Sequence, residues 1–375
     1  MKRRVYTLFF LSLAIGGAQV RNQYLVKHEI RNAVQRQAVC NDGSPAIFYF
    51  RPGAGDDRSK WLVFLQGGGA CNFDADCVER YENQRGLMSS NANGDRISPE
   101  GIFAIRNADN PFANFNHVFV EYCSSDTFLG NTERTLANGV KIQFRGKRII
   151  EALFTDLADP AVIPRPNLRD ATELLFAGSS AGAFGVQNNI DWVASRLPGI
   201  TVRGVLDSSW KPIIEPYGPE VFEVARPAGA PTSYEYWGAV IDETCQAAQS
   251  AQPNACLFTQ VVYPEIRTPV FIYVDQRDQH HVGKQGVTDP YDSSEVEYLT
   301  RYMEETRKSL AGISNYFSPA VGEHTALNTR KFYSIKIDRK SFADTLRNWY
   351  FGGSPTTLMT PAERANAALL EEAGR

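Results

Sequence analysis

The sequence has no excess of charge of either sign. Its 39 basic and 42 acidic residues leave a net charge of -3 over 375 residues. A nucleic-acid-binding protein normally presents a basic face, so the composition argues against a nucleic-acid partner. Hydrophobic residues make up 43% and charged residues 22% of the chain, which is typical of a globular protein and excludes a largely disordered one.

Long apolar runs are also scarce. After residue 18, no run approaches the roughly 20 apolar residues of a membrane-spanning helix, so we expect no stable membrane anchor. Residues 1–18 combine a basic start (Lys2, Arg3 and Arg4), a short apolar stretch and a Gly-Gly-Ala end. This pattern favours a cleavable signal peptide over a retained anchor. We therefore predict a secreted or periplasmic protein.

The sequence lacks the paired C-x-x-C spacing of a zinc site. Six cysteines are an even number in a chain predicted to enter an oxidising compartment, which favours three disulfides. Two pairs are close enough in sequence to be joined locally, which would leave the other two cysteines for each other. The predicted pairs are Cys71–Cys77, Cys245–Cys256 and Cys40–Cys123.

Short apolar runs alternate with helical patterns along the chain. Helical spacing of apolar residues covers 147–157 and 181–197. Such alternation predicts an α/β fold with a mainly parallel sheet between two helical layers. The clearest strand-like runs are residues 61–65, 117–122, 173–177, 202–206 and 269–274.

We expect one domain at residues 19–352. Prolines, glycines and two cysteines within 211–260 predict an insertion over the C-terminal edge of the sheet. Residues 353–375 read as a tail with a short helix. That helix would begin with a capping box from Thr360 to Glu363, with Pro361 at its first position.

The sharpest local signal is a Gly-x-Ser-x-Gly motif from Gly178 to Gly182. A buried strand precedes it and a helix follows, which is the context of a nucleophile elbow. The serine in frame is Ser180, because Ser179 has alanines rather than glycines two residues away on each side. The alternative is a small-residue turn without chemistry. The flanking strand and helix favour a nucleophilic serine.

A glycine run after the strand at 61–65 fits the same chemistry. Gln66 is followed by three glycines and Ala70, as in the loop that donates backbone N–H groups to an oxyanion in hydrolases with this elbow. We expect the donors to be Gly68, Gly69 and Ala181. A phosphate-binding loop is the alternative, but the run lacks the Gly-Lys-Ser/Thr ending of a P-loop.

Histidine is rare, with five in the chain. In α/β-hydrolases the nucleophile precedes the acid, and the histidine lies in a loop near the end of the domain, which selects His324 as the base. Asp278, in the loop after the strand at 269–274, is our first choice for the acid. Asp275 is the second choice and Asp207, after another strand, is the third.

A metal site is an alternative use of the same segment. Asp275, Asp278, His280 and His281 form a compact group of oxygen and nitrogen ligands. Adjacent histidines rarely face one ion together, and no distant ligand with a recognisable spacing accompanies them. We therefore expect a loop with one functional aspartate and no metal site.

Together these segments resemble the pectin acetylesterase family, which includes the Notum-type palmitoleoyl-protein carboxylesterases. The landmarks extend from about residue 40 to about residue 350, and in combination they are far more specific than the serine motif alone. They are residues 41–45 after Cys40, 61–68, 122–126, 178–182 and 203–208, and the segments around Asp278 and His324.

The resemblance implies an α/β-hydrolase fold and cofactor-free hydrolysis of carboxylic esters through an acyl-enzyme. By matching positions it implies Ser180 as nucleophile, Asp278 as acid and His324 as base. It implies oxyanion donors at Gly68, Gly69 and Ala181, and it supports the three cysteine pairs.

The sequence departs from the Notum type beside the expected site. Notum-type members follow the two glycines with bulky aromatics, whereas this chain has Gly69 and Ala70. Long-chain lipid specificity therefore does not carry over, and we expect acetyl or other short esters on a carbohydrate such as an acetylated polysaccharide. The alternatives are a Notum-like long-chain acyl esterase and a non-catalytic binding protein on the same fold.

Overall fold

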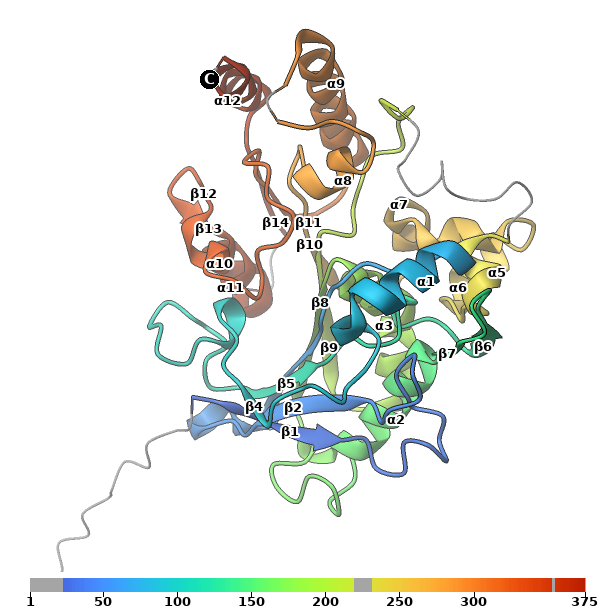
Figure 1. The fold of residues 1–375 in the computed structure, drawn as a ribbon. Coiled ribbons are helices and arrows are strands. Elements are labelled where there is room, and N and C mark those ends of the chain that lie inside the picture. The colour runs from blue at the N-terminus through green and yellow to red at the C-terminus, as the bar shows by residue number, and fades with distance from the viewer. Residues whose placement is uncertain (1–22, 219–230, 290, 353–354, 375) are drawn as a thin grey trace, which may run out of the picture.

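The computed structural model of the protein describes residues 23–218, 231–289, 291–352 and 355–374. The predicted signal peptide, residues 1–18, lies outside the described residues. A large twisted sheet runs through the centre of the molecule, with helices on both sides (Figure 1). Within the described ranges, no helix is both long and apolar enough to cross a bilayer.

The described part of the central sheet has ten strands in the order β14-β11-β10-β9-β8-β3-β5-β2-β1-β4. Every pair from β14 to β5 is parallel, and β2, β1 and β4 add antiparallel pairs at one edge. The prediction of a mainly parallel sheet is confirmed. The strands of this sheet are β1 (Leu25–Glu29), β2 (Ile47–Arg51), β3 (Lys60–Leu65), β4 (Arg96–Ile97), β5 (Asn116–Val120), β8 (Glu173–Ser179), β9 (Thr201–Asp207), β10 (Val270–Tyr273), β11 (Asn315–Ser318) and β14 (Thr356–Met359). Two small hairpins pair β6 (Thr132–Thr135) with β7 (Lys141–Phe144) and β12 (Lys336–Ile337) with β13 (Lys340–Ser341).

Two apolar clusters lie on opposite faces of the sheet. One contains side chains from α2 and α3 and the other contains side chains from α10 and α11, so each helix pair covers one face (Figure 1). This is the arrangement predicted from the alternating pattern. The described helices are α1 (Asp74–Asn83), α2 (Gly146–Leu157), α3 (Ala181–Arg196), α5 (Ser233–Trp237), α6 (Glu243–Ala248), α7 (Thr259–Val262), α8 (Gln279–Gly283), α9 (Ser293–Ser309), α10 (Lys331–Ser334), α11 (Phe342–Gly352) and α12 (Ala362–Ala373).

The C-terminal residues contain a strand as well as the expected helix. β14 pairs in parallel with β11, so residues after 352 extend the central sheet. The helix α12 begins at Ala362, with Pro361 as its N-cap and no side-chain cap hydrogen bond. The predicted capping box is therefore wrong, because Pro361 lies before the helix rather than at its first position.

The described part of the 211–260 insertion contacts elements at the C-terminal ends of β3 and β8. Trp237 Nε1 donates to the carbonyl of Cys71 at 2.6 Å, and Tyr236 donates to Asp74 at the start of α1 at 2.7 Å. Thr259 donates to Gln187 on α3 at 2.8 Å. These contacts place α5 and α7 beside the segments that carry the glycine loop and the serine motif.

The structure contains three disulfides, and no described cysteine is free. One of them joins the segments before β2 and after β5, and the other two close short loops, one after β3 and one within the insertion. They are Cys40–Cys123, Cys71–Cys77 and Cys245–Cys256, the three pairs expected from the sequence.

Candidate active site

The serine motif forms a tight turn between β8 and α3. Ser180 has φ 53° and ψ -122°, a positive φ that non-glycine residues rarely adopt and that is costly to hold. A Cβ atom on Gly178 would collide with the backbone of Gly182, and one on Gly182 would collide with the carbonyl group of Leu65. Glycine is therefore required on both sides of the turn. The turn presents Ser180 at the C-terminal edge of the sheet.

His324 connects the serine to a carboxylate. Its Nε2 lies 2.8 Å from Ser180 Oγ and its Nδ1 lies 2.7 Å from Asp278 Oδ2. The three residues come from the β8–α3 turn, the loop after β10 and the loop after β11. Three of the residues predicted from the sequence therefore form one hydrogen-bonded chain. This spacing suits proton transfer between a hydroxyl and an oriented imidazole.

Backbone hydrogen bonds hold the Asp278 carboxylate in an orientation that faces His324. Its side chain is buried, and its Oδ1 accepts hydrogen bonds from the backbone N–H groups of His280 at 3.0 Å and His281 at 3.1 Å. Burial favours the protonated acid, but the interactions with His281 and His324 outweigh it and lower the pKa of Asp278 below its usual value. The carboxylate stays ionised and orients His324 Nδ1–H.

The other two candidates for the acid, Asp275 and Asp207, accept hydrogen bonds from backbone N–H groups instead of facing His324. Asp275 accepts from the N–H groups of Val321 at 3.0 Å and Glu323 at 3.2 Å, in the loop that carries His324. Burial raises the pKa of Asp275 to about 7. Asp207 accepts from Ser179 Oγ at 2.5 Å and from the N–H of Leu327 at 3.0 Å. Burial also raises the pKa of Asp207.

The glycine loop lies against the serine turn. A Cβ on Gly67 would collide with the Ser179 carbonyl and touch Ser180 Cβ, so the close approach requires glycine here. Gly68 and Gly69 both have positive φ, at 153° and 70°. Ala181, the third expected donor, is the first residue of α3.

Arg80 is a residue that the sequence analysis missed. It is buried in α1, and its Nη2 donates to the carbonyl of Gly68 at 2.8 Å while its Nε donates to Ser125 Oγ at 2.8 Å. Because a trans peptide points its C=O and N–H in opposite directions, a fixed Gly68 carbonyl also fixes the N–H of Gly69. No sequence motif marks Arg80, so only the fold could identify it.

A pocket of about 170 Å³ opens beside Ser180. Gly69, Ala181 and Phe184 lie in its wall, with Phe184 as a large apolar side chain. Four basic or imidazole side chains also line it, and the sequence analysis assigned none of them to substrate binding. They are Lys211, Lys284, His280 and His281.

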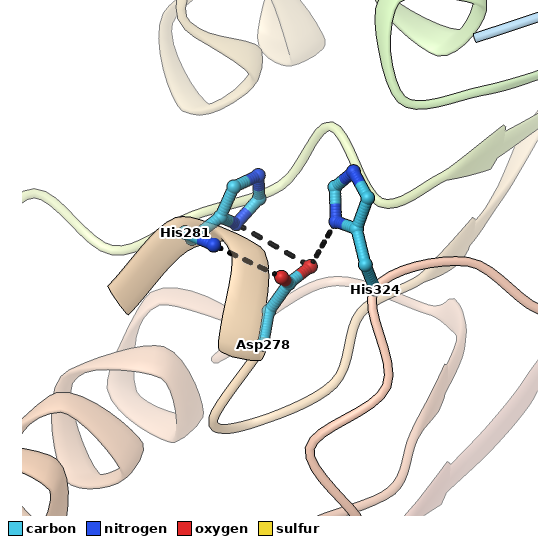
Figure 2. A group of neighbouring side chains, drawn as sticks. All are labelled: Asp278, His281 and His324. Atoms are coloured by element: carbon cyan, nitrogen blue, oxygen red, sulfur yellow. Dashed lines mark hydrogen bonds and ion pairs between the residues drawn. The ribbon is translucent and has the colours of Figure 1, made fainter. Parts of the chain in front are cut away.

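The histidines after Asp278 take different positions. The His280 ring lies 4.3 Å from the His324 ring between centroids, whereas His281 Nδ1 lies 3.5 Å from Asp278 Oδ2. Burial lowers the pKa of His280 to about 4 and that of His281 to about 3, so both rings are neutral at neutral pH. The described residues that could share a metal ion are Asp278, His281 and His324, shown in Figure 2. This differs from the group weighed from the sequence, because Asp275 faces backbone N–H groups and the His280 ring lies against the His324 ring at a tilt.

Comparison with known proteins relates the chain to esterases. The pectinacetylesterase family model matches residues 19–364. Palmitoleoyl-protein carboxylesterase notum1' of Xenopus laevis is 32% identical over 350 residues, covering 88% of this chain and 68% of that protein. Pectin acetylesterase 5 of Arabidopsis thaliana is 28% identical over 373 residues, covering 89% of this chain and 82% of that protein. The chain spans 65% of notum1 of Xenopus laevis.

A solved structure shows the same fold. The Wnt deacylase Notum from Drosophila superposes with a TM-score of 0.78 at 30% identity, covering 89% of this chain and 96% of that one. The predicted α/β-hydrolase fold is confirmed by this match and by the parallel sheet. The match of the family model over nearly the whole described chain settles the classification. The chain belongs to the pectinacetylesterase family.

Proposed function

We propose that the protein is a serine esterase that hydrolyses carboxylic esters through an acyl-enzyme on Ser180. The observation that carries this proposal is the hydrogen-bonded chain from Ser180 through His324 to Asp278, at 2.8 and 2.7 Å. The strained turn at Ser180 supports it, because strain at a non-glycine residue persists where the surrounding fold holds a functional group in place. The carboxylesterases among its relatives agree with this class of reaction.

The proposed reaction has two matching halves. Ser180 Oγ attacks the ester carbonyl while His324 Nε2 takes the hydroxyl proton and then returns it to the leaving alcohol. Water attacks the acyl-enzyme in the same way, with His324 again as base. Asp278 keeps the Nδ1 proton in place, so that Nε2 is the basic nitrogen facing Ser180.

The oxyanion formed in each half needs donors in place before the reaction. We assign the backbone N–H groups of Gly68, Gly69 and Ala181 to this task. Gly69 and Ala181 line the same pocket as Ser180, and Arg80 fixes the peptide between the two glycines. One such donor typically lowers the barrier by about 3–4 kcal/mol.

For the substrate, we propose an acetyl or other short ester on a carbohydrate. The pocket of about 170 Å³ is smaller than the ~300–1,000 Å³ of sites for drug-sized ligands, which suits a short acyl group. Lys211 and Lys284 in its wall favour a carrier with acceptor or acidic groups. The name of the Arabidopsis relative, a pectin acetylesterase, agrees with such a carrier.

A Notum-like long-chain acyl esterase is the second candidate, favoured by the Notum relatives and by the fold match. Initial rates on nitrophenyl esters from two to sixteen carbons distinguish the two candidates, with Ser180→Ala as the blank. Burying a longer chain would contribute about 0.8 kcal/mol per methylene. We expect kcat/KM to be highest for short esters and acetate to be released from an acetylated polysaccharide. A steady rise with chain length would contradict the short-acyl proposal.

We also propose that the protein is exported. The three disulfides support this, since such bonds persist in oxidising compartments. Mass spectrometry of protein recovered from the culture medium or periplasm tests the proposal. Cleavage after residue 18 is the expected result, and retention inside the cell with reduced cysteines would contradict it.

A further inference from the structure

The proposed reaction uses Asp278 and His324 but gives no task to His281. The His281 side chain is 10% exposed, and its Nδ1 is buried without a hydrogen-bond partner in the described part of the chain. That nitrogen faces Asp278 Oδ2 at 3.5 Å, which is too long for a hydrogen bond. A buried nitrogen that is left unpaired next to a carboxylate calls for an explanation, because buried polar atoms are normally satisfied.

The three side chains converge on one point (Figure 2). Asp278 lies between two imidazoles, one on α8 and one in the loop after β11, and the ligand atoms of the three lie within 4.8 Å of one another. Zinc bonds of about 2.0–2.2 Å in tetrahedral geometry put neighbouring ligand atoms about 3.3–3.6 Å apart. The 3.5 Å from Asp278 Oδ2 to His281 Nδ1 lies in that range. The 2.7 Å from Asp278 Oδ2 to His324 Nδ1 is a hydrogen-bond distance, so an ion bound between these two atoms would move them apart.

We propose that Asp278, His281 and His324 form an inhibitory binding site for a zinc-type divalent cation. Two imidazoles and one carboxylate are ligands that suit zinc and not magnesium. With three protein ligands, the fourth position is left to water. An ion can enter through the pocket beside Ser180, since His281 lies in its wall. The described cysteines are all in disulfides and do not compete as ligands.

The inhibition follows from proton positions and rests on the proposed function. The proposed reaction needs the His324 proton on Nδ1, which faces Asp278, and a lone pair on Nε2, which faces Ser180 Oγ. A cation at Nδ1 binds through the lone pair of that nitrogen, which is available only in the tautomer that carries its proton on Nε2, so binding shifts the one imidazole proton from Nδ1 to Nε2. His324 then donates to Ser180 instead of accepting its proton, and the cation also occupies Asp278. Inhibition by the cation therefore involves no covalent bond to the substrate and no change of oxidation state.

Zinc binding is tested first, without reference to activity. The Ser180→Ala protein is used because Ser180 is not a ligand, so its loss leaves the proposed site intact. Calorimetric titration with zinc chloride should show one binding site. Adding His281→Gln should weaken binding about 10-fold or more, whereas adding His280→Gln should leave it unchanged, since His280 is outside the ligand group. Absent binding, or equal binding by the His281→Gln protein, would overturn the site.

The second test measures inhibition. For each protein, the rate of ester hydrolysis with zinc is divided by the rate without zinc. Wild type and His280→Gln should lose activity as zinc is added and recover it with chelator, and magnesium should have no effect. His281→Gln should need about 10-fold more zinc for half-inhibition. Zinc that binds but leaves hydrolysis unchanged would overturn the inhibitory role. A protein without esterase activity would refute the proposed function while leaving the binding result interpretable.

Discussion

Ser179 Oγ donates a hydrogen bond to the buried carboxylate of Asp207 at 2.5 Å, immediately beside Ser180. The two adjacent serines therefore face different partners, Asp207 for Ser179 and His324 for Ser180. Asp207 also accepts from the backbone of Leu327, in the segment that follows His324. It thereby ties the serine turn to the histidine loop.

This difference predicts separate effects for the two serines. Ser180→Ala should reduce kcat about 10⁴-fold or more with an unchanged unfolding midpoint, since only the attacking hydroxyl is lost. Ser179→Ala should keep most activity but lower the free energy of unfolding by about 1–3 kcal/mol, because a buried carboxylate loses a donor. Steady-state kinetics and urea denaturation measure both. An inactive Ser179→Ala beside an active Ser180→Ala would refute the assignment of the nucleophile.

Arg80 should act as a positioning residue for the proposed oxyanion donors. Arg80→Ala frees the Gly68 carbonyl, and we expect kcat for an acetyl ester to fall about 10- to 100-fold while KM changes little. Arg80→Lys should restore part of the rate through its single donor group. Arg85→Ala is the matched control, because Arg85 lies over the Tyr81 ring rather than at the glycine loop. Equal rates for the Arg80→Ala and control variants would contradict the role.

The disulfides should contribute unequally to stability. A longer closed loop loses more entropy in the unfolded chain, so removal of Cys40–Cys123, with a separation of 83 residues, should cost about 4–5 kcal/mol. Removal of Cys71–Cys77, with a separation of 6, should cost about 2 kcal/mol. Denaturation of the two double-alanine variants measures the difference. Peptide mapping without reduction checks the pairing, and free thiols at Cys71 and Cys77 would contradict it.

His281 should make the protein less stable in acid. Burial lowers its pKa from 6.5 to about 3, so the unfolded chain binds the proton first as the pH falls. Its contribution to the free energy of unfolding is therefore lost progressively from about pH 6.5 down to about pH 3. The raised pKa of Asp275, about 7, has the opposite effect, because it favours the folded state as the pH falls. The test therefore compares the free energies of unfolding of His281→Gln and wild type at each pH. As the pH falls through this window, the free energy of unfolding of His281→Gln should rise relative to that of wild type. A difference that does not change with pH would contradict the effect.

The sequence predicted those features that leave a local pattern. The strands β3, β5, β8, β9 and β10 are apolar runs that end at turn residues, and the serine motif lies between a strand and a helix, as predicted. The edge strand β14 was missed, because its four residues, Thr-Thr-Leu-Met, show no clear alternation of apolar and polar positions. Pro361 was misplaced by one position for a similar reason, since helix ends depend on backbone geometry that composition does not fix.

The sequence ranked Asp278 first among three candidate aspartates, but it could not show what each carboxylate faces. Asp207 is the last residue of β9, Asp275 and Asp278 follow β10, and all three are buried. Only the fold shows that Asp278 faces an imidazole while the other two face backbone N–H groups. The group weighed from the sequence as an alternative metal site differs from the group that the fold brings together for the same reason. Chain neighbours on one helical turn point in different directions, and the third ligand, His324, comes from a loop 46 residues from Asp278.

The central claim is that Ser180 is the group that becomes acylated. The most direct measurement is treatment with a fluorophosphonate probe followed by peptide mass spectrometry, with Ser180→Ala and Ser179→Ala proteins treated in parallel. We expect one label, on Ser180, and a loss of ester hydrolysis that is proportional to labelling. The Ser179→Ala protein should be labelled, and the Ser180→Ala protein should not. A label on another residue, or full hydrolysis by unlabelled Ser180→Ala protein, would contradict the account.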